Sequence, residues 1–267
     1  KDIRKNPRPI LLEFKTFRMR GHEEASGTKY VPQELMETWS NKDPLKNFEM
    51  SLCAKNILTK KQIAKATNEF KTEINEHLQI AFDEDPIKVD LTSELKDVYK
   101  AYQQEIISPS SKKSNMRLID AISKGLWESM QRYDNLVIMG QDVAEYGGVF
   151  KITEGFKDQF GRERVRNTPI CESAIVSAAY GASLNGMKAV MEMQFADFVS
   201  SGFNPIVNLL AKSNYRWNQS ADVVVRMPCG AGVGAGPFHS QTNEAWFTKT
   251  PGLKVGYPAF PEDAKGL

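Results

Sequence analysis

The stretch "ESAIVSAAYGASLNGMKAVMEMQF" (residues 172–195) decides the fold of most of this chain. Its first part, 172–186, is rich in small residues around apolar ones and predicts a helix, whereas "KAVMEMQF" (188–195) predicts a buried strand. A short apolar run, "NLVIMG" (135–140), predicts a second buried strand that ends in glycine. Helices that alternate with short buried strands indicate a parallel sheet covered by helices on both faces.

The same alternation continues on both sides of this stretch. The pattern predicts helices over 115–133 and 203–217 and strands over 221–228 and 252–258. The last residues, "PEDAKGL" (261–267), predict the start of another helix. The fold class expected for this part of the chain is therefore α/β.

A mostly helical pattern fills the first hundred residues. The clearest element is a long helix within 59–86, with Thr59 as its N-cap and Pro86 as its stop. Its apolar residues recur every three or four positions, as one stripe requires: Ile63, Ala66, Phe70, Ile74, Leu78 and Phe82. A shorter helix is expected to start at Asp43–Pro44, and a strand is expected over 9–19.

A change of composition separates the two parts. Residues 104–115 contain the run Ser-Pro-Ser-Ser-Lys-Lys-Ser, which is typical of a linker. The expected domains are thus 1–103 and 116–267.

Composition and charge exclude several functional classes. The 267 residues include 35 basic and 33 acidic side chains, so a net charge of +2 gives no reason to expect nucleic acid or a membrane surface as a partner. The three cysteines, Cys53, Cys171 and Cys229, are far apart, which favours a reducing compartment over disulfides or structural zinc. The acidic residues and the three histidines lack metal-ligand spacing, so no metal site is expected on this chain.

The glycine-rich segment "CGAGVGAGPFHSQ" (229–241) has two possible uses. Gly230, Gly232 and Ala235 fit the pattern G-x-G-x-x-[GA] of dinucleotide-binding loops. However, Pro237 stands where that loop needs a helix to begin, and no acidic residue follows near position 255. We therefore expect the glycines to allow unusual backbone angles around His239, with a helix beginning near 240–241.

Several long stretches together resemble the thiamin-diphosphate-dependent 2-oxo acid dehydrogenases, the decarboxylating first component of those complexes. The stretches that resemble the pyrimidine-binding domain of the β subunit are 140–156, 164–183, 191–198, 237–255 and 261–267. Residues 9–31 and the helices after them resemble the C-terminal part of the α subunit. This order implies a thiamin-diphosphate-binding fold preceded by a helical α-subunit tail. It also implies a fused α–β polypeptide of which this chain is an interior piece.

The resemblance implies a function for the whole enzyme. It would decarboxylate a branched-chain 2-oxo acid on thiamin diphosphate and pass the acyl group to the lipoyl domain of an acyltransferase. Mg²⁺ would also be needed, with its ligands outside this chain. A cytoplasmic homodimer is expected, or an αβ heterotetramer if the subunits are unfused. Pyruvate as the substrate, a transketolase-like transferase and a purely structural piece are the alternatives.

The resemblance also implies roles for particular residues. Glu172 would hydrogen-bond the pyrimidine ring of the cofactor, and His239 would exchange protons near the substrate. His22, in the glycine-containing loop 21–32, would orient the substrate during acyl transfer. Gln194 and Phe198 would line the pyrimidine pocket.

Each of these residues also has an interpretation without catalysis. Glu172 could be a helix-start carboxylate favoured by the helix dipole, His22 a loop histidine without a role, and Phe198 a core residue. Glu23 occupies the position where mammalian relatives carry a phosphorylatable serine, so kinase control is not expected there. His77, within the long helix, is expected to be structural or at the surface.

Overall fold

The structure is a computed structural model that describes residues 2–23, 25–103, 108 and 110–267. The chain divides into two compact units, Lys1–Ile87 and Lys88–Leu267.

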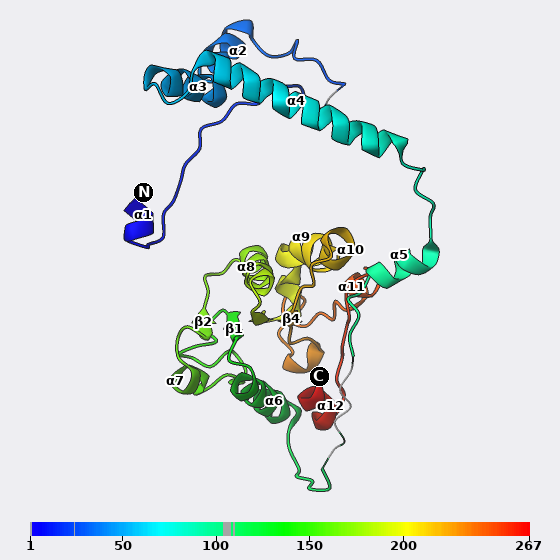
Figure 1. Ribbon diagram of the computed structural model, residues 1–267. Helices are drawn as coiled ribbons and strands as arrows, with labels where there is room; N and C mark the ends of the chain where they lie inside the picture. The colour runs from blue at the N-terminus through cyan, green and yellow to red at the C-terminus, as the bar shows by residue number, and fades with distance from the viewer. Residues whose placement is uncertain (1, 24, 104–107, 109) are drawn as a thin grey trace. The chain divides into compact units, whose positions relative to one another are not determined.

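The second unit is built on a four-stranded parallel sheet (Figure 1). The strands β1 (Leu136–Gly140), β2 (Val165–Asn167), β3 (Lys188–Glu192) and β4 (Val223–Arg226) lie in the order β2-β1-β3-β4. Every residue of β1 is buried, and Ile138 pairs with Val165 on one side and Val190 on the other. The predicted parallel sheet is therefore confirmed, with β1 and β3 at its centre.

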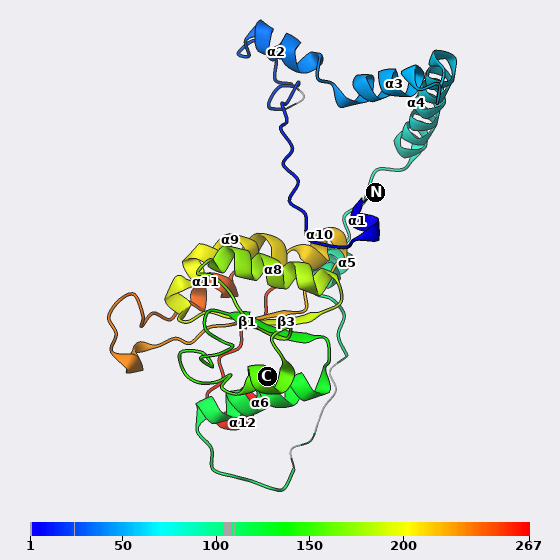
Figure 2. The same cartoon turned by 90° about the vertical axis from the view of Figure 1, so that its left-hand side faces the viewer.

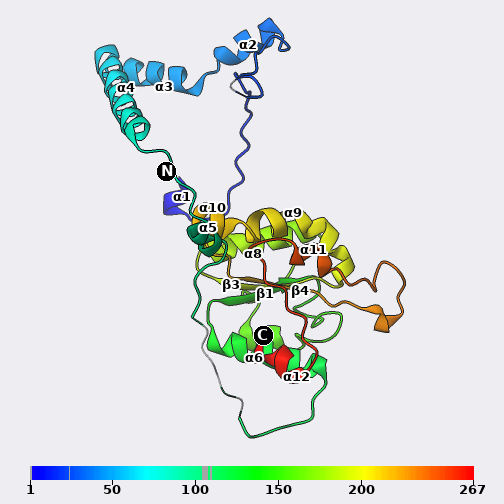
Figure 3. The same cartoon turned by 90° about the vertical axis from the view of Figure 1, so that its right-hand side faces the viewer.

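Helices cover both faces of this sheet, as Figures 2 and 3 show from two sides. One face carries α6 (Leu118–Arg132) and α12 (Pro261–Gly266), and the other carries α8 (Glu172–Leu184), α9 (Phe203–Pro205) and α10 (Ser213–Trp217). Two clusters of buried apolar side chains follow from this layering, because alternate strand residues point to opposite faces. Met191 joins Val176 of α8 in one cluster, and Val190 joins Met130 of α6 in the other.

Short elements complete the second unit. They are α5 (Leu91–Asp97), α7 (Phe156–Phe160), the 3-10 turns Ala196–Gly202 and Ala231–Val233, the π turn Ile206–Leu210, and α11 (Ala245–Thr248). In α5, Glu94 accepts a hydrogen bond of 2.6 Å from the Tyr215 hydroxyl, which raises the pKa of that hydroxyl above its ordinary value of 10.0. The backbone oxygen of Asp97 accepts a second bond, of 2.8 Å, from the Asn214 amide. Residues 91–97 therefore pack with the second unit.

The expected linker 104–115 lies partly outside the described residues, because 104–107 and 109 are not described. The division into domains at 103 and 116 stays a prediction.

The first unit is helical, as expected. It contains α1 (Asp2–Lys5), α2 (Gln33–Ser40), α3 (Pro44–Ala54) and α4 (Lys60–Asp83). Asp43 caps α3 by accepting two backbone N–H bonds, and Thr59 and Gln62 form a reciprocal capping box on α4. The apolar stripe of α4 is largely exposed, with Phe70 at 63% and Phe82 at 77%.

Two of the expected strands are absent from the described residues. Residues 9–19 and 253–259 run without regular secondary structure. An apolar run becomes a strand only where a neighbouring strand accepts its backbone hydrogen bonds, and no such neighbour is described for either segment. The helix expected from 240–241 begins only at Ala245. Just before it, the Asn243 side chain donates a hydrogen bond of 2.9 Å to the backbone oxygen of Ala196.

The close approach of β1 to β3 predicts the effect of one substitution. A Cβ atom added at Gly140 would lie 2.7 Å from the Glu192 carbonyl oxygen and 3.1 Å from Val143. We expect Gly140→Ala to lower the free energy of unfolding by about 1–3 kcal/mol in a denaturant titration, because backbone must move.

The matched control is Gly181→Ala in α8, where an added Cβ meets no atom within 4 Å. It should leave stability unchanged or raise it by up to about 1 kcal/mol. Equal effects of the two substitutions would contradict the β1–β3 packing.

Candidate active site at the carboxyl ends of the strands

The strand order itself places a crevice at one edge of the sheet. After β1 the chain crosses to β2 on one side, and β3 lies on the other side of β1. In open parallel sheets, ligands bind outside the carboxyl ends of the strands where the order reverses in this way. A ligand-binding site is therefore expected at the loops that follow β1 and β3.

Glu172 is connected to the end of β1. Gln141, the residue directly after that strand, is 9% exposed, and its Nε2 donates a hydrogen bond of 3.3 Å to Oε1 of Glu172. Glu172 is half-buried and is the first residue of α8, where the helix dipole favours a negative charge. The carboxylate is thus held at the sheet edge by one neutral amide, with room on it for another partner.

Gln194 is connected to the same loop. It lies two residues after β3, and its Nε2 donates a hydrogen bond of 3.3 Å to Oδ2 of Asp142. Asp142 directly follows Gln141 in the sequence. Two neighbouring residues after β1 therefore contact Glu172 and Gln194, which brings both predicted residues to one edge of the sheet.

The structure also brings His239 and Phe198 together. The His239 ring meets the Phe195 ring edge-on, with centroids 4.9 Å apart, and the Phe198 ring at 5.4 Å. His239 is half-buried, and the Phe150 ring also meets the Phe195 ring edge-on, with centroids 5.7 Å apart. The aromatic rings thus form an apolar surface against which the His239 imidazole packs. His239 lies in the segment that follows β4.

The glycine-rich segment has the backbone angles that we expected. Gly230, Gly234 and Gly236 all have φ between 66° and 106°, a region that other residues rarely adopt. Residues 231–238 are exposed, and the base of the loop is closed by a bond of 3.4 Å from the Gly230 N–H to the Gln241 carbonyl.

A buried ion pair lies beneath this edge of the sheet. Glu192, at the end of β3, is 4% exposed and forms an ion pair with Arg226, its register partner at the end of β4. The Arg226 Nε also donates to Glu192 at 3.2 Å. Gly148, with φ of 76°, covers the pair so closely that an added Cβ would lie 3.0 Å from Oε1 of Glu192. The only signal in the sequence is a charged residue inside each of two apolar strands.

The remaining predicted residue, His22, belongs to the first unit. It is exposed and follows Gly21, where an added Cβ would lie 2.2 Å from the Ser26 carbonyl oxygen. This close contact fixes the fold of the loop that carries His22.

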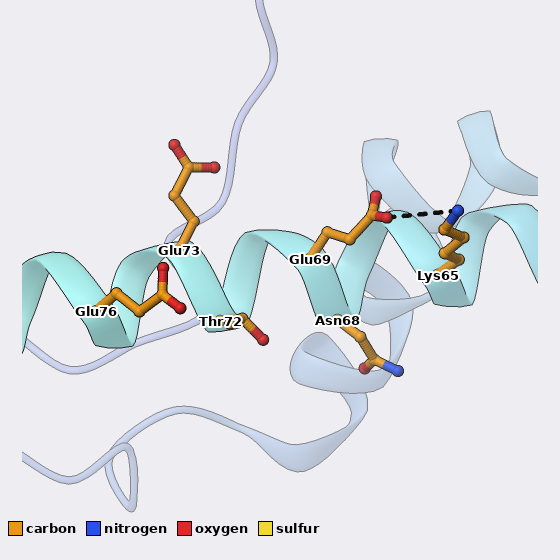
Figure 4. Close-up of a pocket in the computed structure, with 6 residues that line it drawn as sticks. All are labelled: Lys65, Asn68, Glu69, Thr72, Glu73 and Glu76. Atoms are coloured by element: carbon orange, nitrogen blue, oxygen red, sulfur yellow. Dashed lines mark ion pairs between the residues drawn. The ribbon is translucent and has the colours of Figure 1, made fainter.

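A shallow hollow along α4 does not coincide with the predicted site (Figure 4). Its lining residues all come from that one helix: Lys65, Asn68, Glu69, Thr72, Glu73 and Glu76. Lys65 and Glu69 form an ion pair of 3.6 Å across one helical turn. This is the charged, solvated face of an amphipathic helix, opposite in character to an apolar binding site.

The described residues were also compared with the patterns of metal sites and membrane-spanning helices. In the described ranges, no three or more histidine, cysteine, aspartate and glutamate side chains are grouped so that they could hold a metal ion. Of the helices in those ranges, none has the length and apolar character needed to cross a membrane.

Comparison with protein families gives two matches on this one chain. Residues 114–267 match the family described as transketolase, pyrimidine binding domain. Residues 2–89 match the family described as dehydrogenase E1 component. The first match covers the whole sheet and the predicted residues Glu172, Gln194, Phe198 and His239, and the second covers His22.

The curated relatives are similar to more than half of this chain. The chain is 47% identical over 156 residues to the 2-oxoisovalerate dehydrogenase subunit beta of Bacillus subtilis (strain 168), covering 58% of this chain and 48% of the relative. It is 42% identical over 164 residues to the mitochondrial 2-oxoisovalerate dehydrogenase subunit beta of Dictyostelium discoideum, covering 60% and 44%. It is 39% identical over 152 residues to the pyruvate dehydrogenase E1 component subunit beta of Acholeplasma laidlawii, covering 56% and 46%. The chain spans about half the length of these relatives.

The buried ion pair gives a prediction about stability. Glu192→Ala leaves the Arg226 charge buried without its partner, so we expect a loss of about 3–5 kcal/mol in the free energy of unfolding. The double variant Glu192→Leu with Arg226→Met removes both charges, and we expect it to lose less than the single variant. Denaturant titrations of both would measure this, and a double variant that is the less stable of the two would contradict it.

Proposed function

This chain belongs to the transketolase pyrimidine-binding domain family, and we propose that it is part of a 2-oxo acid dehydrogenase that decarboxylates a branched-chain 2-oxo acid. The dehydrogenase E1 match on the same polypeptide confirms the family that the sequence resembles and its cofactor, thiamin diphosphate. The fused α–β order expected from the sequence is supported by the presence of both matches on one chain.

The observation that carries the choice of substrate is the 47% identity to a protein named 2-oxoisovalerate dehydrogenase subunit beta. Relatives from Dictyostelium discoideum and Pseudomonas aeruginosa carry the same name at 42% and 40% identity. The second candidate is the pyruvate dehydrogenase equivalent, which the Acholeplasma laidlawii relative favours at 39%. We therefore place branched-chain 2-oxo acids first and pyruvate second.

The edge of the sheet has the donor and acceptor groups that a pyrimidine ring needs. Glu172 offers a half-buried carboxylate that uses one oxygen for Gln141. The hydroxyl of Thr168, which follows β2, is buried and has no hydrogen-bond partner among the described residues. A ring with nitrogen donors and acceptors suits such a mixture of apolar walls and a few polar groups.

Glu172 is the residue that we propose to hold the pyrimidine ring, with Gln194 and Phe198 beside it. Thiamin diphosphate supplies the carbanion chemistry of decarboxylation when it is bound. The protein then has to orient the ring and control a proton at the Glu172 carboxyl group. The magnesium that accompanies the diphosphate would take its ligands from outside this chain.

His239 is the residue that we propose to exchange protons near the substrate. Imidazole suits this work because it gains and loses a proton near neutral pH. The rings of Phe195 and Phe198 pack against this imidazole. His22 would act at the acyl-transfer step, with the lipoyl domain of an acyltransferase as the partner.

The assembly that we propose is a homodimer in the cytoplasm, with the fused chain as its subunit. The net charge of +2 supports partners other than nucleic acid or a membrane surface.

Substitution of Glu172 tests this assignment. We expect Glu172→Ala in the full-length protein to abolish decarboxylation of 3-methyl-2-oxobutanoate with thiamin diphosphate and Mg²⁺, because the ring loses its anchor. The unfolding midpoint should change little, since the carboxylate is only half-buried. Near-normal turnover by this variant would overturn the assignment.

Two controls sharpen the assay. Glu163→Ala removes a carboxylate that is 87% exposed, and it should keep wild-type turnover. Pyruvate and a ketose phosphate are tested beside the branched-chain acid. A higher kcat/KM for pyruvate would select the second candidate, and activity on the ketose phosphate alone would favour a transketolase-like enzyme.

A further inference from the structure

Four consecutive residues, Phe195–Phe198, form a turn that contacts the histidine segment 239–243 at every position. We name it the FADF turn. Phe195 and Phe198 meet the His239 ring. The carbonyl of Ala196 accepts a hydrogen bond of 2.9 Å from the buried Asn243 amide. Asp197 accepts a bond of 3.3 Å on Oδ1 from the backbone N–H of Gln241.

The glycine loop by itself does not hold His239 in one place. Residues 231–238 are exposed, and three of these eight positions are glycines, which lose the most conformational freedom on ordering. Within the loop, one bond of 3.3 Å joins the His239 N–H to the Gly236 carbonyl. The contacts that fix the imidazole thus come mainly from the FADF turn.

Asp197 is an unusual residue for such a turn. It is 9% exposed, and its Oδ2 is buried without a hydrogen-bond partner among the described residues. The hydroxyl of Ser240, next to His239, is also buried and unpartnered in the same part of the chain. A buried carboxylate oxygen without a donor costs stability, so a carboxylate at this position is not explained by stability alone.

We propose that Asp197 is a positioning residue for His239. Its carboxylate accepts the hydrogen bond from the Gln241 backbone N–H, two residues beyond the histidine. This bond fixes the backbone and so keeps the imidazole packed against Phe195 and Phe198. This role rests on the proposed function of His239, but the position of the ring can be measured without any assay of that function.

The three histidines of the chain make that measurement direct. Among the described residues, His239 is the one histidine that lies against two aromatic rings, so ring currents should displace its imidazole proton signals from those of His22 and His77. We expect Asp197→Ala to abolish this displacement and to leave the other two histidine signals unchanged. Asp197→Asn keeps an acceptor oxygen for Gln241 and should restore most of the displacement.

Kinetics in the full-length protein provide the second readout. We expect Asp197→Ala to lower kcat by about 10- to 100-fold, as a displacement of about 1 Å in a reacting group can do, with KM changed much less. Asp197→Asn should recover most of the rate. The control Asp158→Ala removes a carboxylate that is 82% exposed on α7, and it should change neither readout.

The outcomes separate this proposal from the proposed function. If the His239 signals stay displaced in Asp197→Ala, or if Asn fails to restore them in a chain that unfolds at the wild-type midpoint, the positioning role is overturned. If the signals move as expected while the wild-type protein shows no 2-oxo acid decarboxylation, the positioning role stands and the proposed function falls.

Discussion

The contacts of Glu172 and Gln194 depend on the register of β1 against β3, where Gly140 pairs with Glu192. Because parallel strands end at the same edge, this register brings the residues after β1 beside the residues after β3. Gln141 then reaches Glu172, and Asp142 reaches Gln194. A slip of one residue would turn the side chains of the slipped strand to the other face of the sheet. The absence of a side chain at Gly140 is what lets the two strand ends approach so closely.

The second requirement is that His239 stands at the end of a loop that is itself poorly anchored. A loop with several glycines can take the angles that the chain needs, but it contributes little to fixing a ring. The aromatic rings of Phe195 and Phe198 and the polar groups between them provide a mount outside the loop. The glycine loop therefore allows the chain to bring His239 to the site, and the turn packed on the core fixes the position of its ring.

The sequence predicted the helices and strands whose signals are local. Residues 172–195 form a helix and a strand as expected, because helix periodicity and a short apolar run are both properties of neighbouring residues. The apolar run at 9–19 failed as a strand because strand formation depends on a partner far away in the sequence. The contacts of Gln141 and Asp197 were missed for the same reason, since each joins residues more than 30 positions apart. Glu172 and His239 were predicted through resemblance to a family, not through their surroundings.

The two units of the chain differ in what holds them together. In the described residues, all buried apolar side chains that form the core belong to the second unit, from Ala121 to Phe247. The helix α4, although 24 residues long and well capped, has no buried residue. Most helical stability in proteins comes from packing of an amphipathic face, so the exposed stripe with Phe70 and Ile74 leaves α4 dependent on its own capping and propensity. Substitutions at Glu172, Asp197 or Glu192 can therefore be judged against a cooperative core in their own unit. His22 lies in the first unit, where the described residues form no such core, so a change in its function has to be measured in the whole protein.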